Sequence, residues 1–195
     1  MTPRHEIRAD YDDDTIVVYQ AYSNEIAEAA LAAGRFVAPF SFNRMTWIKP
    51  SFLWMMERSG WARKPGQERV LAVRLSRAGW ESALARAVLS HPSAHTTAGD
   101  WSERIKSASV VVQWDPERAL RGGKLAHRSI QVGLGPLVVR PYVDQWIQEL
   151  RDETPRVAQM RALLHDGDDA RARELLPVER PYPVPAESAM ALGMI

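Results

Sequence analysis

The pattern of apolar and polar positions predicts a strand followed by a helix near the start of the chain. Residues 15–22 crowd β-branched and aromatic side chains between polar residues, a pattern typical of a buried strand. The alanine-rich stretch that follows has acidic residues in its first turn and Gly34 at its end, so a helix is expected over 24–33. Ser23 or Asn24 is suited to begin that helix.

The next part of the chain predicts two helices that flank a second strand. Residues 35–50 are aromatic, contain prolines and lack a period, which indicates an ordered loop packed on the core. A largely buried helix is expected over 51–60 and a strand over 70–75. Apolar residues then recur at helical spacing, which predicts a helix over 77–90.

Two strands in succession are predicted in the middle of the chain. Small polar residues over 93–100 indicate a loop. A strand is expected over 109–114, where Asp115 and Pro116 stop it, and another over 128–134. Because only a basic turn separates these two strands, we expect them to pair.

Helices are predicted toward the C-terminal end. From residue 137 the apolar positions change to a helical period that continues to Leu150. A short helical hairpin is expected over 155–177. The last residues, 186–195, are expected to form a frayed tail.

These elements predict an α+β fold with a mixed, mostly antiparallel sheet and a C-terminal helical segment. A chain of 195 residues, 46% hydrophobic and 25% charged, fits one globular domain, which we place at residues 1–185. The chain has no cysteine, which excludes thiol catalysis, iron–sulfur clusters and cysteine-based zinc sites. It has seven tryptophans, an unusually high number.

Charge and targeting signals restrict the function further. The 25 basic and 24 acidic residues nearly cancel, so any site for an anion must be local. The N-terminal stretch has no apolar core of the kind that a secretory signal needs, and nowhere are 18 consecutive residues apolar. We therefore expect a cytoplasmic protein without a membrane partner. The five histidines lie in different segments, so no metal site is expected.

Aromatic and basic side chains interleave most densely over residues 42–70. Trp47 lies between Arg44 and Lys49 in an apolar stretch, and Ser51 follows at the start of the next helix. Aromatic rings can stack on bases while cations hold phosphates, and a cation in an apolar loop needs a partner or a ligand. The alternative is that the rings belong to the core and the cations face water.

A second group of candidate residues lies on the strand predicted at 128–134. Strand alternation places Ser129, Gln131 and Gly133 on one face and Arg128 on the other. The first face is too polar for an ordinary core and too small for an ordinary surface, so it could line a pocket, although its hydrogen bonds could equally be structural. His127 lies at the mouth of the strand, and histidine is the residue type most often used to transfer protons in catalysis.

The first strand contributes the remaining candidates. Arg8 precedes the strand, and Tyr19 and Tyr22 lie on it. Gln20 and Tyr22 share one face. An aromatic ring here could stack on a base.

Several of these segments together resemble a known family. Five segments are similar to the domain-of-unknown-function family numbered 4291, found in bacteria and fungi. These segments are EIRADYDDDTIVVYQAYS, MTWIKPSFLWMM, VQWDPER, HRSIQVGLG and LLPVERPYP. The resemblance covers about residues 4–185. It implies kinship and brings no activity or catalytic residues.

The sequence leads to two functional hypotheses. The first is an enzyme acting on a nucleotide or nucleotide-like substrate by ADP-ribosyl or nucleotidyl transfer, with NAD or a nucleoside triphosphate as cofactor and His127 as general acid or base. Its candidate substrate-binding residues are Arg8, Tyr19, Tyr22, Arg44, Trp47, Lys49, Ser51, Arg128 and Gln131. The second is a non-catalytic module that binds nucleic acid or protein through the surface around residues 42–70.

Overall fold

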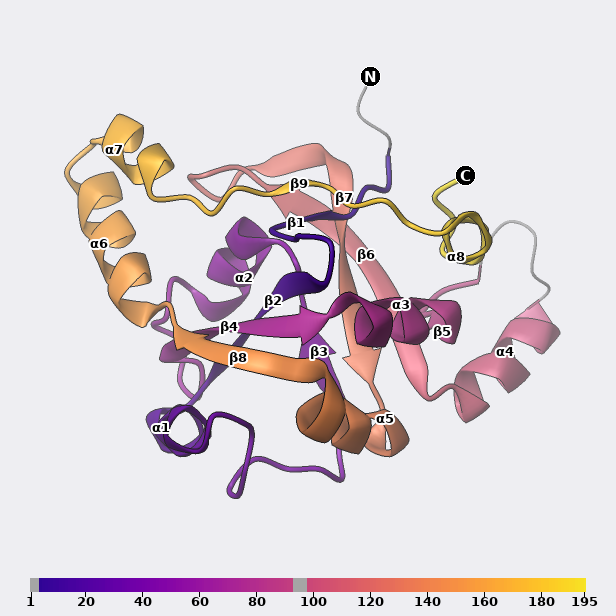
Figure 1. Cartoon of the computed structure of the whole chain (residues 1–195). Coiled ribbons are helices and arrows are strands. Elements are labelled where there is room, and N and C mark those ends of the chain that lie inside the picture. The colour runs from indigo at the N-terminus through magenta and orange to yellow at the C-terminus, as the bar shows by residue number, and fades with distance from the viewer. Residues whose placement is uncertain (1–3, 93–97) are drawn as a thin grey trace.

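The computed structural model describes residues 4–92 and 98–195 and shows an α+β fold (Figure 1). A three-stranded antiparallel sheet has the order β2-β4-β8. Its members are β2 (Thr15–Tyr22), β4 (Arg69–Ser76) and β8 (Ile147–Asp152). The strands predicted over 15–22 and 70–75 are therefore confirmed, and the structure shows that they pair with each other.

A four-stranded sheet has the order β3-β7-β6-β5. Its members are β3 (Thr46–Ile48), β5 (Ala87–Leu89), β6 (Val110–Arg118) and β7 (Lys124–Leu134). Only β5 runs parallel to its neighbour, so the sheet is mixed and mostly antiparallel, as predicted. A small third sheet pairs β1 (Arg8–Ala9) with β9 (Arg180–Pro181) and so ties the two ends of the chain together.

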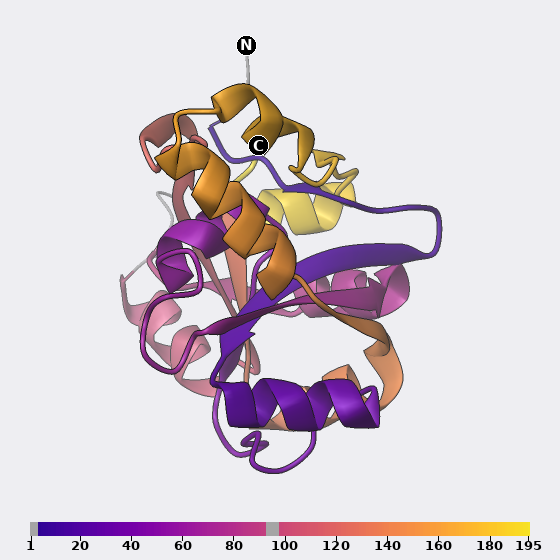
Figure 2. The ribbon, with the colours of Figure 1, turned by 90° about the vertical axis from the view of Figure 1, so that its left-hand side faces the viewer.

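Helices cover the sheets and fill their ends. They are α1 (Asn24–Ala33), α2 (Phe52–Ser59), α3 (Arg77–Ala85), α4 (Ala98–Ser107), α5 (Pro136–Pro141), the π-helical turn η1 (Tyr142–Trp146), α6 (Thr154–His165), α7 (Asp169–Glu174) and α8 (Ala186–Ala191). Figures 1 and 2 show α1 and the α6–α7 hairpin on opposite sides of the three-stranded sheet.

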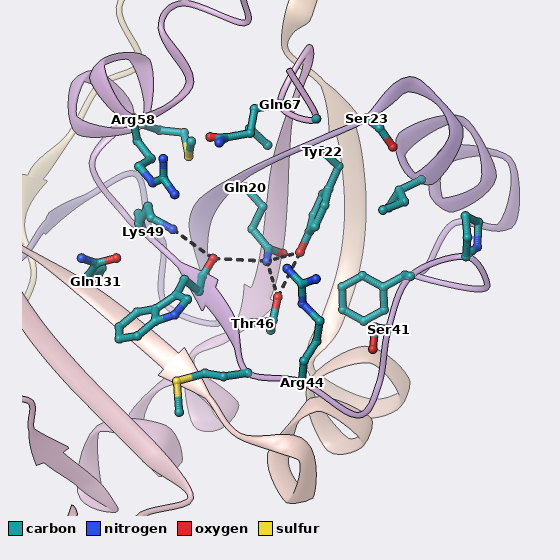
Figure 3. Close-up of a pocket in the computed structure, with 18 of the residues that line it drawn as sticks. Gln20, Tyr22, Ser23, Ser41, Arg44, Thr46, Lys49, Arg58, Gln67 and Gln131 are labelled. Carbon is teal, nitrogen blue, oxygen red and sulfur yellow. Dashed lines mark hydrogen bonds between the residues drawn. The ribbon is translucent and has the colours of Figure 1, made fainter. Parts of the chain in front are cut away.

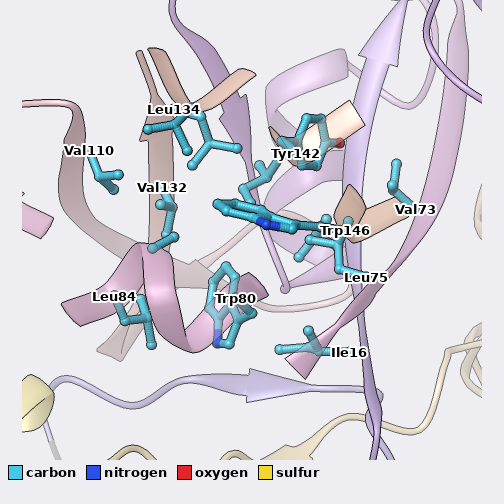
Figure 4. Packing of buried hydrophobic residues seen from close by; sticks show 14 of the residues in the cluster. Ile16, Val73, Leu75, Trp80, Leu84, Val110, Val132, Leu134, Tyr142 and Trp146 are labelled. Atoms are coloured by element: carbon cyan, nitrogen blue, oxygen red, sulfur yellow. The ribbon is translucent and has the colours of Figure 1, made fainter. Parts of the chain in front are cut away.

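Strand β2 lies between two hydrophobic clusters, which explains its unbroken apolar run. Ile16 and Val18 face the larger cluster between the two sheets, whereas Val17 and Tyr19 face a smaller cluster against α2 and α6. Alternate side chains of a strand point to opposite faces, so a strand buried on both faces shows no polar alternation. Trp80 and Trp146 pack in the larger cluster (Figure 4).

Three short strands correct the sequence-based expectations. Residues 147–152 form β8 instead of continuing the helix predicted to Leu150, and residues 87–89 form β5 instead of the end of a helix. In the loop predicted over 35–50, residues 46–48 form β3. Each of these segments pairs with a longer strand, and such pairing decides the conformation of a short segment that local pattern leaves ambiguous.

Strand β6 continues through Pro116, where we expected it to stop. On one side, Pro116 pairs with Arg128 of β7. On the other side, the pairing with β5 has already ended at Val112, so the missing N–H of the proline interrupts no ladder there. The loop predicted over 93–100 lies outside the described residues up to 97, and residues 98–100 begin α4.

The C-terminal segment is ordered, where we expected a frayed tail. Residues 186–191 form α8, and Leu192 after it is fully buried. The indole Nε1 of Trp114 donates a 2.9 Å hydrogen bond to the carbonyl of Leu192. The ring of His5 hydrogen-bonds to the carbonyl of Gly193 at 2.7 Å, so both ends of the chain pack on the second sheet.

Glu179 holds the segment before β9 against the start of α2. Its Oε1 accepts a 2.7 Å hydrogen bond from the backbone N–H of Phe52. Burial raises the pKa of this carboxyl to about 8, and the nearby charge of Glu117 acts in the same direction.

We expect the contribution of Glu179 to the stability of the fold to fall as pH rises, because its carboxyl keeps its proton in the folded chain. Between the pKa of about 4.5 of an exposed glutamate and the value near 8 in the fold, the folded state binds more protons than the unfolded state. This contribution is fully present below pH 4.5 and is lost as pH passes 8. Glu179→Gln should therefore flatten the decline in the free energy of unfolding measured by urea titration from pH 5 to 7, below the range in which the lowered pKa of Lys49 acts in the opposite direction. An equal slope in both proteins would contradict the assignment.

Candidate functional site

A cleft of about 650 Å³ opens where the end of β2 meets β3 (Figure 3). Its walls come from β2, the start of α1, the loop before β3, α2, the turn before β4, and the middle strands β6 and β7. Two backbone hydrogen bonds between Tyr19 and Lys49, of 2.7 and 3.3 Å, join the two sheets at this point. The cleft therefore lies where the backbones of the two sheets are hydrogen-bonded to each other.

A buried polar network forms the floor of the cleft. The amide Nε2 of Gln20 is 2.7 Å from the hydroxyl of Tyr22, 3.0 Å from Oγ1 of Thr46 and 3.2 Å from the carbonyl of Trp47. The hydroxyl of Tyr142, which does not line the cleft, donates a hydrogen bond to Oε1 of Gln20. Burial raises the pKa of Tyr22 to about 12, so its hydroxyl stays protonated and neutral.

Trp47 lies on the wall of the cleft, over β7. The ring is only partly buried, and a Cβ at Gly133 would come within 3.0 Å of it and 2.7 Å of the sulfur of Met45. Glycine at this position therefore lets the indole lie close against the strand. The face of β7 predicted to be small and polar supports an aromatic ring and contributes Gln131 to the cleft.

Lys49 is the buried cation of the cleft. The residue is 6% exposed, and its Nζ donates a 3.2 Å hydrogen bond to the carbonyl of Trp47. Nζ also lies 5.4 Å from the centre of the Trp54 ring. Burial lowers the pKa of Lys49 to about 7, and the positive charge of Arg58 lowers it further, while Asp115 opposes them. The amine thus exchanges its proton near neutral pH.

Two arginines and three amides complete the wall. Arg44 and Arg58 are exposed, and within the described part of the chain neither guanidinium group has a hydrogen-bond or ion-pair partner. Gln67, Gln113 and Gln131 lie on the same cleft. None of the described residues that line it is acidic.

Asp115, whose negative charge acts on Lys49, accepts hydrogen bonds from two of these amides. Nε2 of Gln131 donates to it at 2.6 Å and Nε2 of Gln113 at 3.0 Å. These bonds leave the amide oxygens free as acceptors, and Asp115 itself is not among the residues that line the cleft. The cleft is therefore locally positive in a chain whose total charge is close to zero.

Five of the residues proposed from the sequence come together in this cleft. They are Tyr22, Arg44, Trp47, Lys49 and Gln131. The cleft is not lined by the other five, which are Arg8, Tyr19, Ser51, His127 and Arg128.

Three of these five support the fold around α2 and the chain ends. Arg8 forms a 3.3 Å ion pair with Glu6. Tyr19 is buried on the opposite face of β2 from the cleft, edge-to-face with Phe52. Ser51 caps α2 and donates a 2.9 Å hydrogen bond to Glu117.

The last two lie on β7, away from the cleft. Arg128 points to the face opposite Gln131 and donates a 2.8 Å hydrogen bond to the carbonyl of Trp114. His127 lies in the N-terminal half of β7 and does not line the cleft. The histidine is therefore not placed to exchange a proton with a ligand there.

The sequence reasoning did not select several residues of the cleft. Gln20 carried a signal, since it is a polar residue inside an apolar strand and shares a face with Tyr22. Gln113 also carried one, because alternation on β6 places it beside Asp115. Nothing local marked Gln67 or distinguished Arg58 from the other basic residues of its segment.

A comparison of the sequence with models of known protein families found a match. The family model described as a domain of unknown function, DUF4291, matches residues 6–182. The chain belongs to the DUF4291 family. This confirms the resemblance found in the sequence, and it extends over β1 to β9 and so includes the whole cleft. No curated protein matches the sequence. Because the DUF4291 description names no activity, the cleft itself must suggest the function.

Two further properties concern metals and membranes. Within residues 4–92 and 98–195, no group of three or more histidine or acidic side chains is arranged to hold a metal ion. In the same residues, no helix has both the length and the apolar character needed to cross a bilayer.

Proposed function

We propose that this DUF4291 protein is an enzyme that binds a nucleotide or nucleotide-like substrate in the cleft between the sheets. One observation carries the proposal: Arg44, Lys49 and Arg58 line a single cleft that has no acidic lining residue among those described. Two guanidinium groups and a buried amine, none of them paired with a carboxylate, are suited to a multiply charged anion such as a diphosphate.

The surroundings of these cations favour a nucleotide over a simple anion. The exposed part of the Trp47 ring offers a surface on which a base can stack. Gln67 and Gln113 offer amide groups that can donate to and accept from the polar edge of a base. A cleft of about 650 Å³ is within the range of sites that hold small molecules of this size.

The proposed reaction is transfer of a nucleotidyl or ADP-ribosyl group, with NAD or a nucleoside triphosphate as the donor. In either reaction the bond that breaks is near a diphosphate, which Arg44 and Arg58 would hold. Lys49 replaces His127 as our candidate general acid, because its amine lies in the cleft and can gain and lose a proton near neutral pH.

A ligand screen tests the binding part of the proposal. At 100 times its dissociation constant a ligand that binds only the folded state stabilises it by about 2.7 kcal/mol. For a chain of this length we therefore expect thermal unfolding to shift upward by about 5 to 10 °C with NAD or a nucleoside triphosphate. Short RNA and DNA strands should give smaller shifts.

The screen also separates the alternative, a non-catalytic module that binds nucleic acid. Binding to a nucleic acid backbone weakens steeply with salt, because several counterions are displaced. A preference for RNA or DNA that disappears between 50 and 200 mM salt would favour the alternative. No shift with any nucleotide would refute the proposed function.

A further inference from the structure

Lys49 is the one charged side chain of the cleft wall that is buried. Of the four lysines in the sequence, Lys64, Lys106 and Lys124 are exposed. Lys49 is 6% exposed, and two backbone hydrogen bonds to Tyr19 hold its main chain in place. The amine therefore cannot escape into water by a small movement of the backbone.

The partners of the amine do not include a counter-ion. Its one printed hydrogen bond goes to the carbonyl of Trp47, and within the described residues no carboxylate lies within ion-pair distance of it. A buried ammonium without an anion is costly, and the cost is avoided when the amine loses its proton.

The charged and titratable groups around Lys49 act together to favour the neutral amine. Arg58 of α2 repels an ammonium, and Arg44 lines the same cleft from the loop before β3. Asp115 of β6 attracts it but is already held by the amides of Gln113 and Gln131. Tyr19 and Tyr22 of β2 keep their protons, because burial raises the pKa of both hydroxyls.

We propose that Lys49 takes up a proton when an anion enters the cleft, so that anion binding by this site is coupled to protonation. The inference rests on the proposed function, because it concerns the same cleft and the same class of ligand. The entering anion supplies the negative charge that the buried amine lacks. Lys49 then becomes the third cation of the site only in the bound state.

Proton coupling gives the affinity a defined dependence on pH. The pKa of Lys49 in the free cleft is about 7, so below pH 7 the amine is already charged and the affinity changes little. Above pH 7 each unit should weaken binding about tenfold, until the pH reaches the higher pKa of the occupied site. At pH 8 binding should take up about 0.9 proton for each anion.

Isothermal titration calorimetry in HEPES, Tricine and Tris buffers measures this uptake, because the observed enthalpy then varies with the ionisation enthalpy of the buffer. The probes are sulfate and NAD, whose own charges do not change between pH 6.5 and 9. Sodium chloride at equal ionic strength is the control for salt. We expect uptake of about 0.9 proton at pH 8 for the unmodified chain.

Three variants assign the proton to Lys49. Lys49→Met fills the same space without a charge, so it should bind more weakly and take up no proton. Lys49→Arg is charged at every pH tested, so its affinity should not depend on pH between 6.5 and 9. Lys124→Met removes an exposed lysine outside the cleft and should behave as the unmodified chain.

The other possible results refute either the proton coupling alone or the coupling together with the proposed function. Binding of either probe without proton uptake, or uptake that persists in Lys49→Met, would refute the coupling and leave the proposed binding function in place. Failure of both sulfate and NAD to bind at any pH would refute the proposed function and the coupling together.

Discussion

Replacing both Arg44 and Arg58 by glutamine is expected to weaken the binding of NAD or ATP by about a hundredfold to ten-thousandfold. A hydrogen bond to a charged group contributes about 1.5 to 3 kcal/mol, and two arginines that hold the same diphosphate lose that amount each. Lys49 cannot compensate, because it is a single buried amine and the variant lacks two exposed guanidinium groups.

The fold should tolerate this double substitution. Both arginines are exposed and their guanidinium groups have no hydrogen-bond or ion-pair partner among the residues that the structure describes, so thermal unfolding without ligand should change little. Calorimetric titration measures the affinity. The matched control is Arg63→Gln with Arg104→Gln, which removes the same charge from exposed positions outside the cleft. Equal loss of affinity in the control would show that total charge, and not the cleft, holds the ligand.

Gly79→Ala is expected to produce the largest loss of stability of any single methyl addition in the core. A Cβ at this position in α3 would lie 2.4 Å from the Cγ of Trp146. That atom belongs to a rigid ring which is itself buried between the sheets and cannot turn aside (Figure 4). Overpacking of this kind costs about 1 to 3 kcal/mol, and a clash with a ring belongs at the upper end.

Thermal unfolding measures this effect, with a fall of about 4 to 12 °C expected for a chain of this length. Gly99→Ala is the matched control, because it lies in α4 and its Cβ would meet nothing within 4 Å. The control should leave the unfolding temperature unchanged or raise it slightly, since alanine favours a helix more than glycine. A stable Gly79→Ala variant would show that the packing of α3 against η1 is looser than described.

Elements with a strong local signal were predictable from the sequence. Strand β2 has a dense β-branched run, α1 ends at a glycine with a φ of 67°, and Gly167 and Asp168 separate α6 from α7, with Asp168 capping α7. The strands β3, β5 and β8 were not predictable, because segments of three to six residues take their conformation from the strand beside them.

The candidate site was predictable to the extent that its residues are close in sequence. Arg44, Trp47 and Lys49 lie within six residues, and strand alternation placed Gln131 on the face that lines the cleft. Gln67 lies in the turn before β4, and no local sequence pattern indicated that this turn would line the cleft. The same alternation that brings Gln131 to the cleft carries Arg128 away from it.

The seven tryptophans provide the most direct test of the central claim, that a nucleotide binds in this cleft beside Trp47. Each indole N–H gives its own signal in a nitrogen–proton correlation spectrum, and a Trp47→Phe variant assigns the signal that matters. Titration with NAD and with ATP should shift the Trp47 signal first and leave those of the buried Trp80 and Trp146 unchanged. A titration that saturates without moving the Trp47 signal, or that moves only the signal of Trp101 or Trp114, which do not line the cleft, would contradict the claim.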